Sequence, residues 1–269
     1  MAYCRSVHSR YALGHRPGNG MNWSFSSLMN YESCAHRFKL AKIDRLPEPP
    51  RPPDNPLERG NRVHNRYEAY IKGESQVFDN EAKHSAMFRE ATDHLRLLYT
   101  LGMATSEDDW LFNRDWDEVP KKMQCSVHGH EKPNDDCEEC GQRVWLWAKL
   151  DACVMDEDGK KVIVIDFKTG KSQYKAIEHV QQLQLYAAIA ALKYPWAETI
   201  IPELWYLDEG HVRQSEYTLE QALGFVGRFE VRADRIFKDR LYRPNPNVQT
   251  CRWCPYGPRA GTGACAVGV

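Results

Sequence analysis

The sequence predicts an α/β fold, in which strands form a sheet and amphipathic helices pack against it. The run of β-branched residues Val162–Ile165 is typical of a buried strand. Segments with apolar residues at helical spacing lie before and after this strand, as expected of a sheet covered by helices. The chain has 269 residues, of which 42% are hydrophobic and 27% charged, so it can bury a large core.

The central strand ends in charges that suit metal-assisted chemistry. Side chains alternate along a strand, so Asp166 and Lys168 leave on one side and Phe167 on the other. A carboxylate can bind a divalent cation, and an ammonium can position a water or stabilise charge developing on a phosphate. This pair therefore indicates phosphodiester hydrolysis. The alternative is a surface hairpin with ordinary charges beside its turn.

A second predicted strand, Trp145–Met155, supplies another carboxylate. The run Asp156–Gly159 between the two strands is a hairpin signal. Pairing the strands can bring Asp151 beside Asp166, giving two carboxylates and a lysine at one end of a sheet.

Composition excludes several classes of protein. No apolar run approaches the length of a membrane span, and the N-terminus lacks a signal-peptide core. The formal net charge is −1, so a nucleic-acid site has to be a local patch. Nine cysteines without a signal peptide indicate metal binding in a reducing compartment rather than disulfides.

The N-terminal third is predicted to be a leader, helices and a connector. Residues 1–21, which are basic and glycine-rich at their end, are expected to be flexible. A short helix capped by Ser24 or Ser26 follows, and the proline-rich residues 46–56 predict an extended connector. The apolar face of the short helix consists of Leu28, Tyr31 and Cys34.

Two longer helices are expected next. The first opens at Leu57 and carries His64 on its surface, with Val63, Tyr67 and Ile71 as its inward stripe. The second spans Glu81–Met103, and its expected core stripe is Met87, Ala91, Leu95 and Leu98.

A metal-binding insertion is predicted between the strand Trp110–Val119 and the strand Trp145–Met155. Residues 120–143 have the two-knuckle spacing of a structural zinc site, with His130 as a substitute for the histidine ligand. The expected ligands are Cys125, His128, Cys137 and Cys140. The alternative is a reduced cysteine cluster without metal.

The C-terminal half is predicted to complete the sheet and to hold a second metal centre. A helix over Lys175–Leu192 places Gln182 and Tyr186 on one face, four residues apart. A hairpin follows at Asp208–Gly210, and then a closing helix over Leu219–Phe237. The cysteine motif of residues 251–265 offers Cys251, Cys254 and Cys265, for which Cys34 is the natural distant partner.

These motifs together resemble the RecB-like nucleases of the PD-(D/E)XK superfamily, in particular the iron–sulfur branch that includes CRISPR-adaptation exonucleases and AddB-type helicase–nucleases. The resemblance extends from Trp23 to Cys265. It depends on the joint order of Ser26-x-Leu28-x2-Tyr31-x2-Cys34, Gly60-x2-Val63-His64, Asp151, Asp166-Phe-Lys168-Thr-Gly, Gln182-x3-Tyr186 and the terminal cysteines.

The resemblance implies one domain over residues 22–269 with a restriction-endonuclease-like core, a mixed central sheet flanked by helices. It implies that Mg²⁺ or Mn²⁺ is bound by His64, Asp151, Asp166 and the Phe167 carbonyl. Lys168 would position or activate the attacking water, while Gln182 and Tyr186 support the site and contact DNA. A [4Fe–4S] cluster on Cys34, Cys251, Cys254 and Cys265 is also implied, although Cys254 and Cys265 are further apart than family members usually have them. The zinc-like insertion is not a general family feature, and we expect it to stiffen the hairpin at the DNA entrance.

We therefore predict a metal-dependent DNA exonuclease acting at ends or on single strands in recombination, repair or replication. One alternative is a structure-selective endonuclease on the same core, and another is a DNA-end-binding adaptor with little turnover. The chain lacks a Gly-x4-Gly-Lys-Ser/Thr motor loop, so a helicase, recombinase or annealing protein would be a separate partner. From the family we expect a cytoplasmic setting in a bacterial or phage-infected cell.

Overall fold

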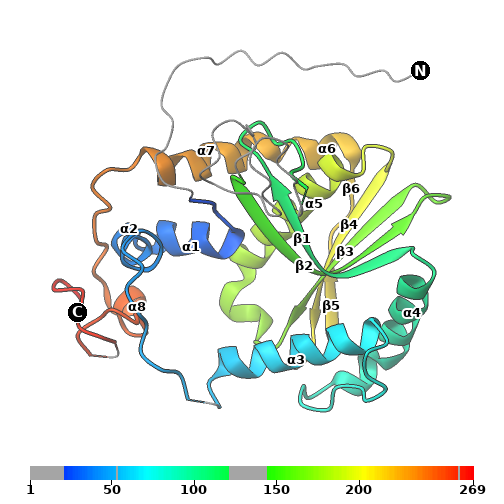
Figure 1. The fold of residues 1–269 in the computed structure, drawn as a ribbon, viewed down its shortest axis with the longest axis horizontal. Helices are drawn as coiled ribbons and strands as arrows, with labels where there is room; N and C mark the ends of the chain where they lie inside the picture. The colour runs from blue at the N-terminus through cyan, green and yellow to red at the C-terminus, as the bar shows by residue number, and fades with distance from the viewer. Residues whose placement is uncertain (1–20, 53, 121–143, 260) are drawn as a thin grey trace, which may run out of the picture.

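The computed structural model describes residues 21–52, 54–120, 144–259 and 261–269, and its centre is a six-stranded mixed sheet (Figure 1). The strand order is β1-β2-β3-β4-β5, with β6 beside β4. Strands β3 and β4 are parallel, and the other neighbours are antiparallel. The strands are β1 (Ala104–Phe112), β2 (Leu146–Asp156), β3 (Lys161–Lys168), β4 (Thr199–Tyr206), β5 (His211–Gln214) and β6 (Tyr217–Thr218).

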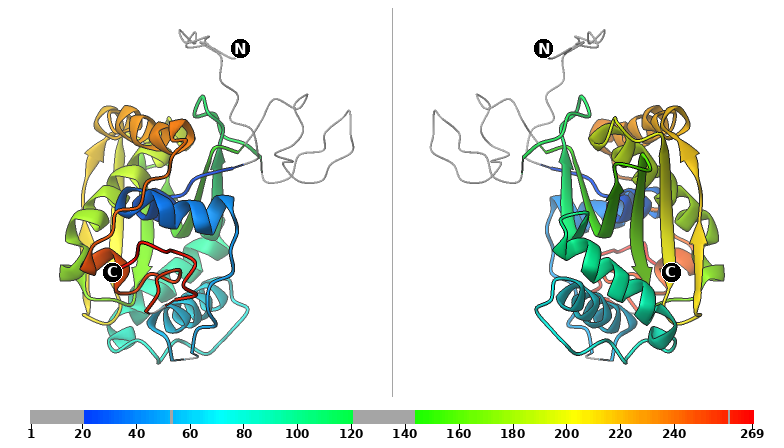
Figure 2. Two further views of the ribbon diagram at one scale, coloured as in Figure 1. Left: turned by 90° about the vertical axis from the view of Figure 1, so that its left-hand side faces the viewer. Right: turned by 90° about the vertical axis from the view of Figure 1, so that its right-hand side faces the viewer.

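Helices cover both faces of this sheet, which confirms the predicted mixed sheet flanked by helices (Figure 2). Helices α1, α5 and α7 pack together on one face, and α3 and α4 lie on the other. The α-helices are α1 (Phe25–Ser33), α2 (Ala35–Phe38), α3 (Pro56–Ile71), α4 (Arg89–Thr100), α5 (Ala176–Lys193), α6 (Leu219–Leu223), α7 (Val226–Lys238) and α8 (Val248–Cys251). No helix in the described part of the chain is long and apolar enough to cross a membrane.

Strand β3 is buried on both faces, as its β-branched sequence predicts. Val162 and Val164 belong to the core that includes α5 and α7, whereas Ile165 and Phe167 belong to the core on the side of α3. This alternation is the two-residue period of a strand. The predicted hairpin after β2 is also confirmed, because β2 and β3 pair antiparallel across the turn.

Local capping and burial confirm the two helices that lead into the sheet. Ser24, rather than Ser26, caps α1, and its hydroxyl accepts a hydrogen bond from the Ser27 N–H. Helix α3 buries Val63, Tyr67 and Ile71, the three residues of its predicted stripe.

The predicted helix over residues 81–103 is partly wrong. The helix begins only at Arg89, after a 3₁₀ turn at Ser85–Phe88, and Met87 is 65% exposed. Ala91 is also exposed, whereas Leu95 is buried and Leu98 packs against the core as predicted, together with Phe88 and Thr92. A 3₁₀ turn has three residues per turn, so it shifts the phase of the apolar stripe. The side chain of Asp79 holds the segment outside the helix by accepting hydrogen bonds from Ala82 and Ser85.

Two other boundaries differ from the prediction. Strand β1 begins at Ala104 and ends at Phe112. It ends there because Asn113 Oδ1 accepts hydrogen bonds from the backbone N–H groups of Asp115 and Asp117, which turns the chain back. The predicted closing helix is interrupted between α6 and α7, at Gly224 and Phe225. The expected leader, apart from Met21, and the zinc ligands Cys125, His128, Cys137 and Cys140 lie outside the described residues.

Packing of α5 against β4 can be tested by truncation. Leu183 is fully buried with Leu204 and Tyr206, so Leu183→Ala should lower the free energy of unfolding by about 2–5 kcal/mol. Ile177 lies on the same helix but is 76% exposed, so Ile177→Ala should change the free energy of unfolding by less than about 0.5 kcal/mol. Urea denaturation of the two variants measures both values, and equal losses would contradict the packing described.

Candidate metal-binding site

The two central antiparallel strands separate where the candidate carboxylates lie. Pairing of β2 with β3 ends at Ala152 and Ile165, so Asp151 and Asp166 each stand one residue beyond the last pair. The ladder between β1 and β2 skips the position opposite Asp151, which is Glu107, and the φ of Glu107 is +50°. A glutamate seldom adopts this left-handed conformation, which costs about 1–3 kcal/mol. The sheet is therefore opened and distorted around three acids.

A histidine and two of these carboxylates form a cluster with metal-ligand spacing. His64, Glu107 and Asp151 each offer a ligand atom, and these atoms all lie within 4.8 Å of one another. His64 reaches the cluster from α3, and its Nδ1 is 2.9 Å from Asp151 Oδ1. Glu107 is almost fully buried and forms an ion pair with Lys149. Imidazole and carboxylate are common ligands of divalent cations in proteins.

Asp166 is held by polar side chains of α5 and by the lysine two residues after it. Its Oδ1 accepts hydrogen bonds from Gln182 Nε2 at 3.0 Å and from the Tyr186 hydroxyl at 2.9 Å. Gln182 Nε2 also donates to the Tyr186 oxygen, at 2.7 Å. The other carboxylate oxygen, Oδ2, lies 2.5 Å from Lys168 Nζ. As expected from strand geometry, Asp166 and Lys168 share one side of β3.

Asp151 connects the two groups. Its Oδ1 contacts His64, and its Oδ2 accepts the backbone N–H of Phe167 at 2.5 Å. That N–H lies between Asp166 and Lys168 in sequence, so the position of Asp151 fixes the end of β3. The ring of Phe167 points to the sheet face covered by α3, where it packs against Tyr67 with ring centroids 4.8 Å apart.

The two central carboxyl groups have pKa values shifted in opposite directions. Burial acts to raise the pKa of Asp151, but the charge and hydrogen bond of His64 outweigh it and lower that pKa. Burial raises the pKa of Asp166; Lys168 opposes this shift and the charge of Asp151 adds to it. Burial acts to lower the pKa of His64, and Asp151 raises it overall. The opposite shifts therefore follow from the neighbours of each group, since Asp151 faces His64 whereas Asp166 is buried beside the negative Asp151.

Two buried carboxylate oxygens in this site have one lysine ammonium each as their partner among the described residues. They are Glu107 Oε2, beside Lys149, and Asp166 Oδ2, beside Lys168. Buried carboxylate oxygens normally have hydrogen-bond donors or metal ions as partners. The donor set therefore fits a divalent cation, which would complete the coordination of these oxygens.

The structure brings together six of the residues that the sequence predicts for the site. They are His64, Asp151, Asp166, Lys168, Gln182 and Tyr186, which form one connected network. Sequence reasoning missed Glu107. It lies in the acidic run Glu107–Asp109, for which the sequence predicts no element, and only the start of β1 at Ala104 places it opposite Asp151.

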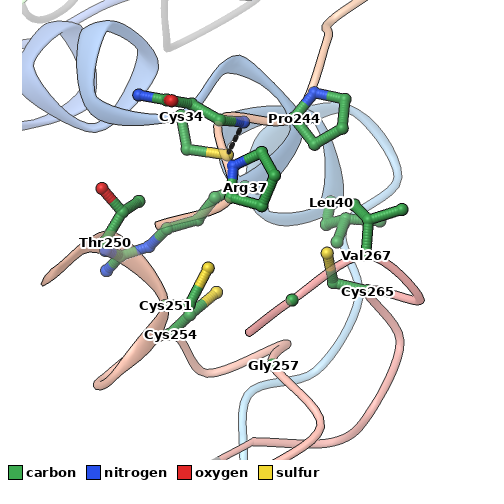
Figure 3. A pocket seen from close by; sticks show the side chains of 13 residues that line it. Cys34, Arg37, Leu40, Pro244, Thr250, Cys251, Cys254, Gly257, Cys265 and Val267 are labelled. Carbon is green, nitrogen blue, oxygen red and sulfur yellow. Dashed lines mark hydrogen bonds between the residues drawn. The ribbon is translucent and has the colours of Figure 1, made fainter. Parts of the chain in front are cut away.

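The four cysteines proposed for a second centre line one small cavity of about 20 Å³ (Figure 3). Cys34 follows α1, Cys251 ends α8, and Cys254 and Cys265 are buried together against Leu40. The longer spacing before Cys265 is accommodated by a loop, because the Cys265 N–H donates to the Tyr256 carbonyl at 2.8 Å. Figure 3 shows the four sulfur atoms directed toward a common space.

Comparison with known proteins agrees with this geometry. The sequence profile of the PD-(D/E)XK nuclease superfamily matches residues 22–259. No curated protein matches the sequence significantly. Among solved structures, the crystal structure of SSO0001 is 17% identical over 90% of this chain and 87% of that chain, with a TM-score of 0.40, a likeness too low to indicate an activity. From the profile match over most of its length, the chain belongs to the PD-(D/E)XK nuclease superfamily.

Proposed function

We propose that the protein is a Mg²⁺- or Mn²⁺-dependent deoxyribonuclease, an exonuclease that hydrolyses phosphodiester bonds at DNA ends or in single strands. The observation that carries the proposal is the linked pair of buried carboxylates, with Asp151 on the Phe167 N–H and Asp166 on Lys168. The superfamily consists mostly of metal-dependent nucleases, which supports the class of reaction. Recombination, repair or replication of DNA would be the setting.

Four side chains and one carbonyl are available to hold the cation. The side chains of His64, Glu107 and Asp151 form the cluster within 4.8 Å, which does not include Asp166. Asp166 and the Phe167 carbonyl are added because the resemblance implies them. When bound, the metal ion would polarise the scissile phosphate and activate a water for attack. The buried Asp151 and Asp166 give the site the negative charge that such an ion requires.

Lys168 is the group best placed to act on the water or on the phosphate. Its side chain is 22% exposed, so it contacts Asp166 while remaining open to a substrate. An ammonium there can donate to the attacking water or to phosphate oxygens as negative charge develops. Burial and the charge of Asp166 raise the pKa of Tyr186 well above its usual range, so its hydroxyl stays protonated and keeps Asp166 oriented.

The same contacts support a RecB-like assignment within the superfamily. The histidine on α3 and the glutamine and tyrosine on α5 all touch the catalytic carboxylates, which are the roles that the resemblance implies. An endonuclease on the same core and a DNA-end-binding adaptor remain the alternatives. A helicase, recombinase or annealing protein would then act with it as a partner, in the cytoplasm of a bacterial or phage-infected cell.

For the cysteine cavity we propose a [4Fe–4S] cluster bound by Cys34, Cys251, Cys254 and Cys265. Four thiolates in tetrahedral zinc coordination, with bonds of about 2.3 Å, would lie roughly 3.8 Å apart. Among the described residues, no three of these sulfurs lie within 4.8 Å of one another, and this wider arrangement favours a multi-iron group. A structural zinc ion on Cys125, His128, Cys137 and Cys140 is a further proposal, based on their spacing alone.

The nuclease proposal is tested on end-labelled linear DNA and on closed circles, single-stranded and duplex, with Mg²⁺ or Mn²⁺. Wild type should degrade linear DNA only. Asp166→Ala should lower the rate by on the order of a hundredfold or more, the scale seen when transition-state charge loses a stabilising group. Asp158→Ala, in the exposed turn between β2 and β3, is the matched control and should leave the rate unchanged. Cutting of circles would favour the endonuclease, and DNA binding without any metal-dependent cleavage would favour the adaptor.

The role of Glu107 is tested by calorimetric titration of Mn²⁺ without DNA. Glu107→Gln keeps the size of the side chain but removes a charged ligand, so the affinity should fall by about tenfold or more. Glu118→Gln removes an exposed carboxylate that pairs with Lys193 and should leave the affinity unchanged. Equal affinities for Glu107→Gln and wild type would show that Glu107 does not bind the ion.

The cysteine proposal is tested by metal analysis of anaerobically purified protein. Wild type should contain iron and acid-labile sulfide in equal amounts, and Cys251→Ser or Cys254→Ser should lose both. Cys153 is buried in the main core away from the cavity, so Cys153→Ala should retain them. Stoichiometric zinc in place of iron, or unchanged iron in the serine variants, would contradict the proposal.

A further inference from the structure

The sheet face that carries Asp166 and Lys168 continues, two strands away, into a basic edge. Residues paired in register on neighbouring strands share a face. Asp166 pairs with Leu204, which pairs with Arg213 on β5, and Lys168 pairs through Tyr206 with His211. Because adjacent strands lie about 4.8 Å apart, Arg213 and His211 lie roughly 10 Å from the catalytic pair.

An open groove of about 530 Å³ lies along this edge, which we call the β5 groove. One wall is β5, with His211 and Arg213, and the other consists of Ser172 and Gln173 in the 3₁₀ turn Ser172–Lys175 and of Ala176 at the start of α5. The turn begins four residues after Lys168, and the opposite wall lies two strands from β3, so both walls connect to the candidate site through short stretches of chain or sheet. The Arg213 guanidinium donates to the Ala176 carbonyl at 3.4 Å, a contact that joins the two walls.

Positive charge gathers at the groove, although the whole chain has a formal net charge of −1. Lys171 and Lys175 are exposed on the turn, and Arg213 is half-buried on the opposite wall. The acids nearby are Glu178, 3.6 Å from Lys175, and Glu209, which accepts the Ser172 N–H. Exposed pairs at such distances leave the lysines able to contact phosphate. This is the kind of local patch that a nearly neutral nucleic-acid-binding protein needs.

An exposed aromatic side chain stands at the same turn. Tyr174 is 74% exposed, Ile177 is 76% exposed, and Lys171 Nζ lies 5.9 Å from the centroid of the Tyr174 ring. Aromatic rings interleaved with cations are the platforms on which proteins stack the bases of single strands. Bases inside a duplex are already stacked on their neighbours, so Tyr174 suits an unpaired base.

We propose that the β5 groove holds a single strand of DNA as it passes to or from Asp166 and Lys168, with one phosphate on Arg213 inside the groove. Lys175 and Tyr174, which are exposed on the adjoining turn, would contact a further phosphate and stack on a base. The proposal rests on the proposed nuclease function and deepens it, because it names the strand form that the site takes.

Binding is measured by fluorescence anisotropy of labelled oligothymidylate, with the full chain carrying Asp166→Asn so that nothing is cleaved. Adding Tyr174→Ala should weaken binding about 5- to 100-fold, the range for loss of one base stack. Adding Arg213→Ala should also weaken it and should reduce the slope of log affinity against log salt by about one. Arg228→Ala removes an exposed arginine of α7 and is the matched control for charge.

A small substrate distinguishes strand binding in the β5 groove from hydrolysis at the candidate metal site. Hydrolysis of thymidine 5′-monophosphate p-nitrophenyl ester, a single nucleotide with no neighbouring base to stack on Tyr174, should be unchanged by Tyr174→Ala in an otherwise wild-type chain. Unchanged affinity for the oligonucleotide in both groove variants would overturn the proposal, and so would equal losses on a blunt duplex. If wild type cleaves no DNA but the groove variants still bind single strands weakly, the nuclease proposal fails and the groove assignment stands.

Discussion

Burial of negative charge at the opening between β2 and β3 is the constraint on which the rest of the structure depends. Asp151 and Asp166 are both buried, and a buried carboxylate is stable only with partners. These partners come from three elements: His64 from α3, the Phe167 N–H from β3, and Gln182 and Tyr186 from α5. The helices on both faces therefore have to be in place before the site is complete.

The two cores determine where those partners stand. On one face, Val63 and Tyr67 pack with Phe167 and fix the rotation of α3, which directs His64 toward the sheet. On the other face, the buried Leu183 fixes α5, so that the polar residues on its flank meet Asp166. The proposed functional groups are thus positioned by apolar contacts that lie directly beside them in sequence.

Much of this arrangement could be predicted from the sequence, because it depends on local patterns. The β-branched run of β3, the turn after β2 and the spacing of Gln182 and Tyr186 each indicate their own element, and the carboxylate pair follows from strand pairing. Glu107 could not be found in this way, since its position depends on the register of β1 and on a left-handed backbone. The first half of the predicted core stripe, Met87 and Ala91, was wrong because side-chain hydrogen bonds of Asp79 to the chain just after it accompany a 3₁₀ turn that periodicity does not reveal. The β5 groove likewise arises only when β5 is paired across β4.

At position 107, selection for folding stability and selection for the metal site favour different residues. Glycine adopts a φ of +50° freely, so Glu107→Gly would relieve local strain and would also remove a buried charge. Selection for folding stability alone would favour glycine at this position, and the carboxylate would then be lost. Among relatives with this bent β1, the residue at position 107 should therefore record whether the site is still in use.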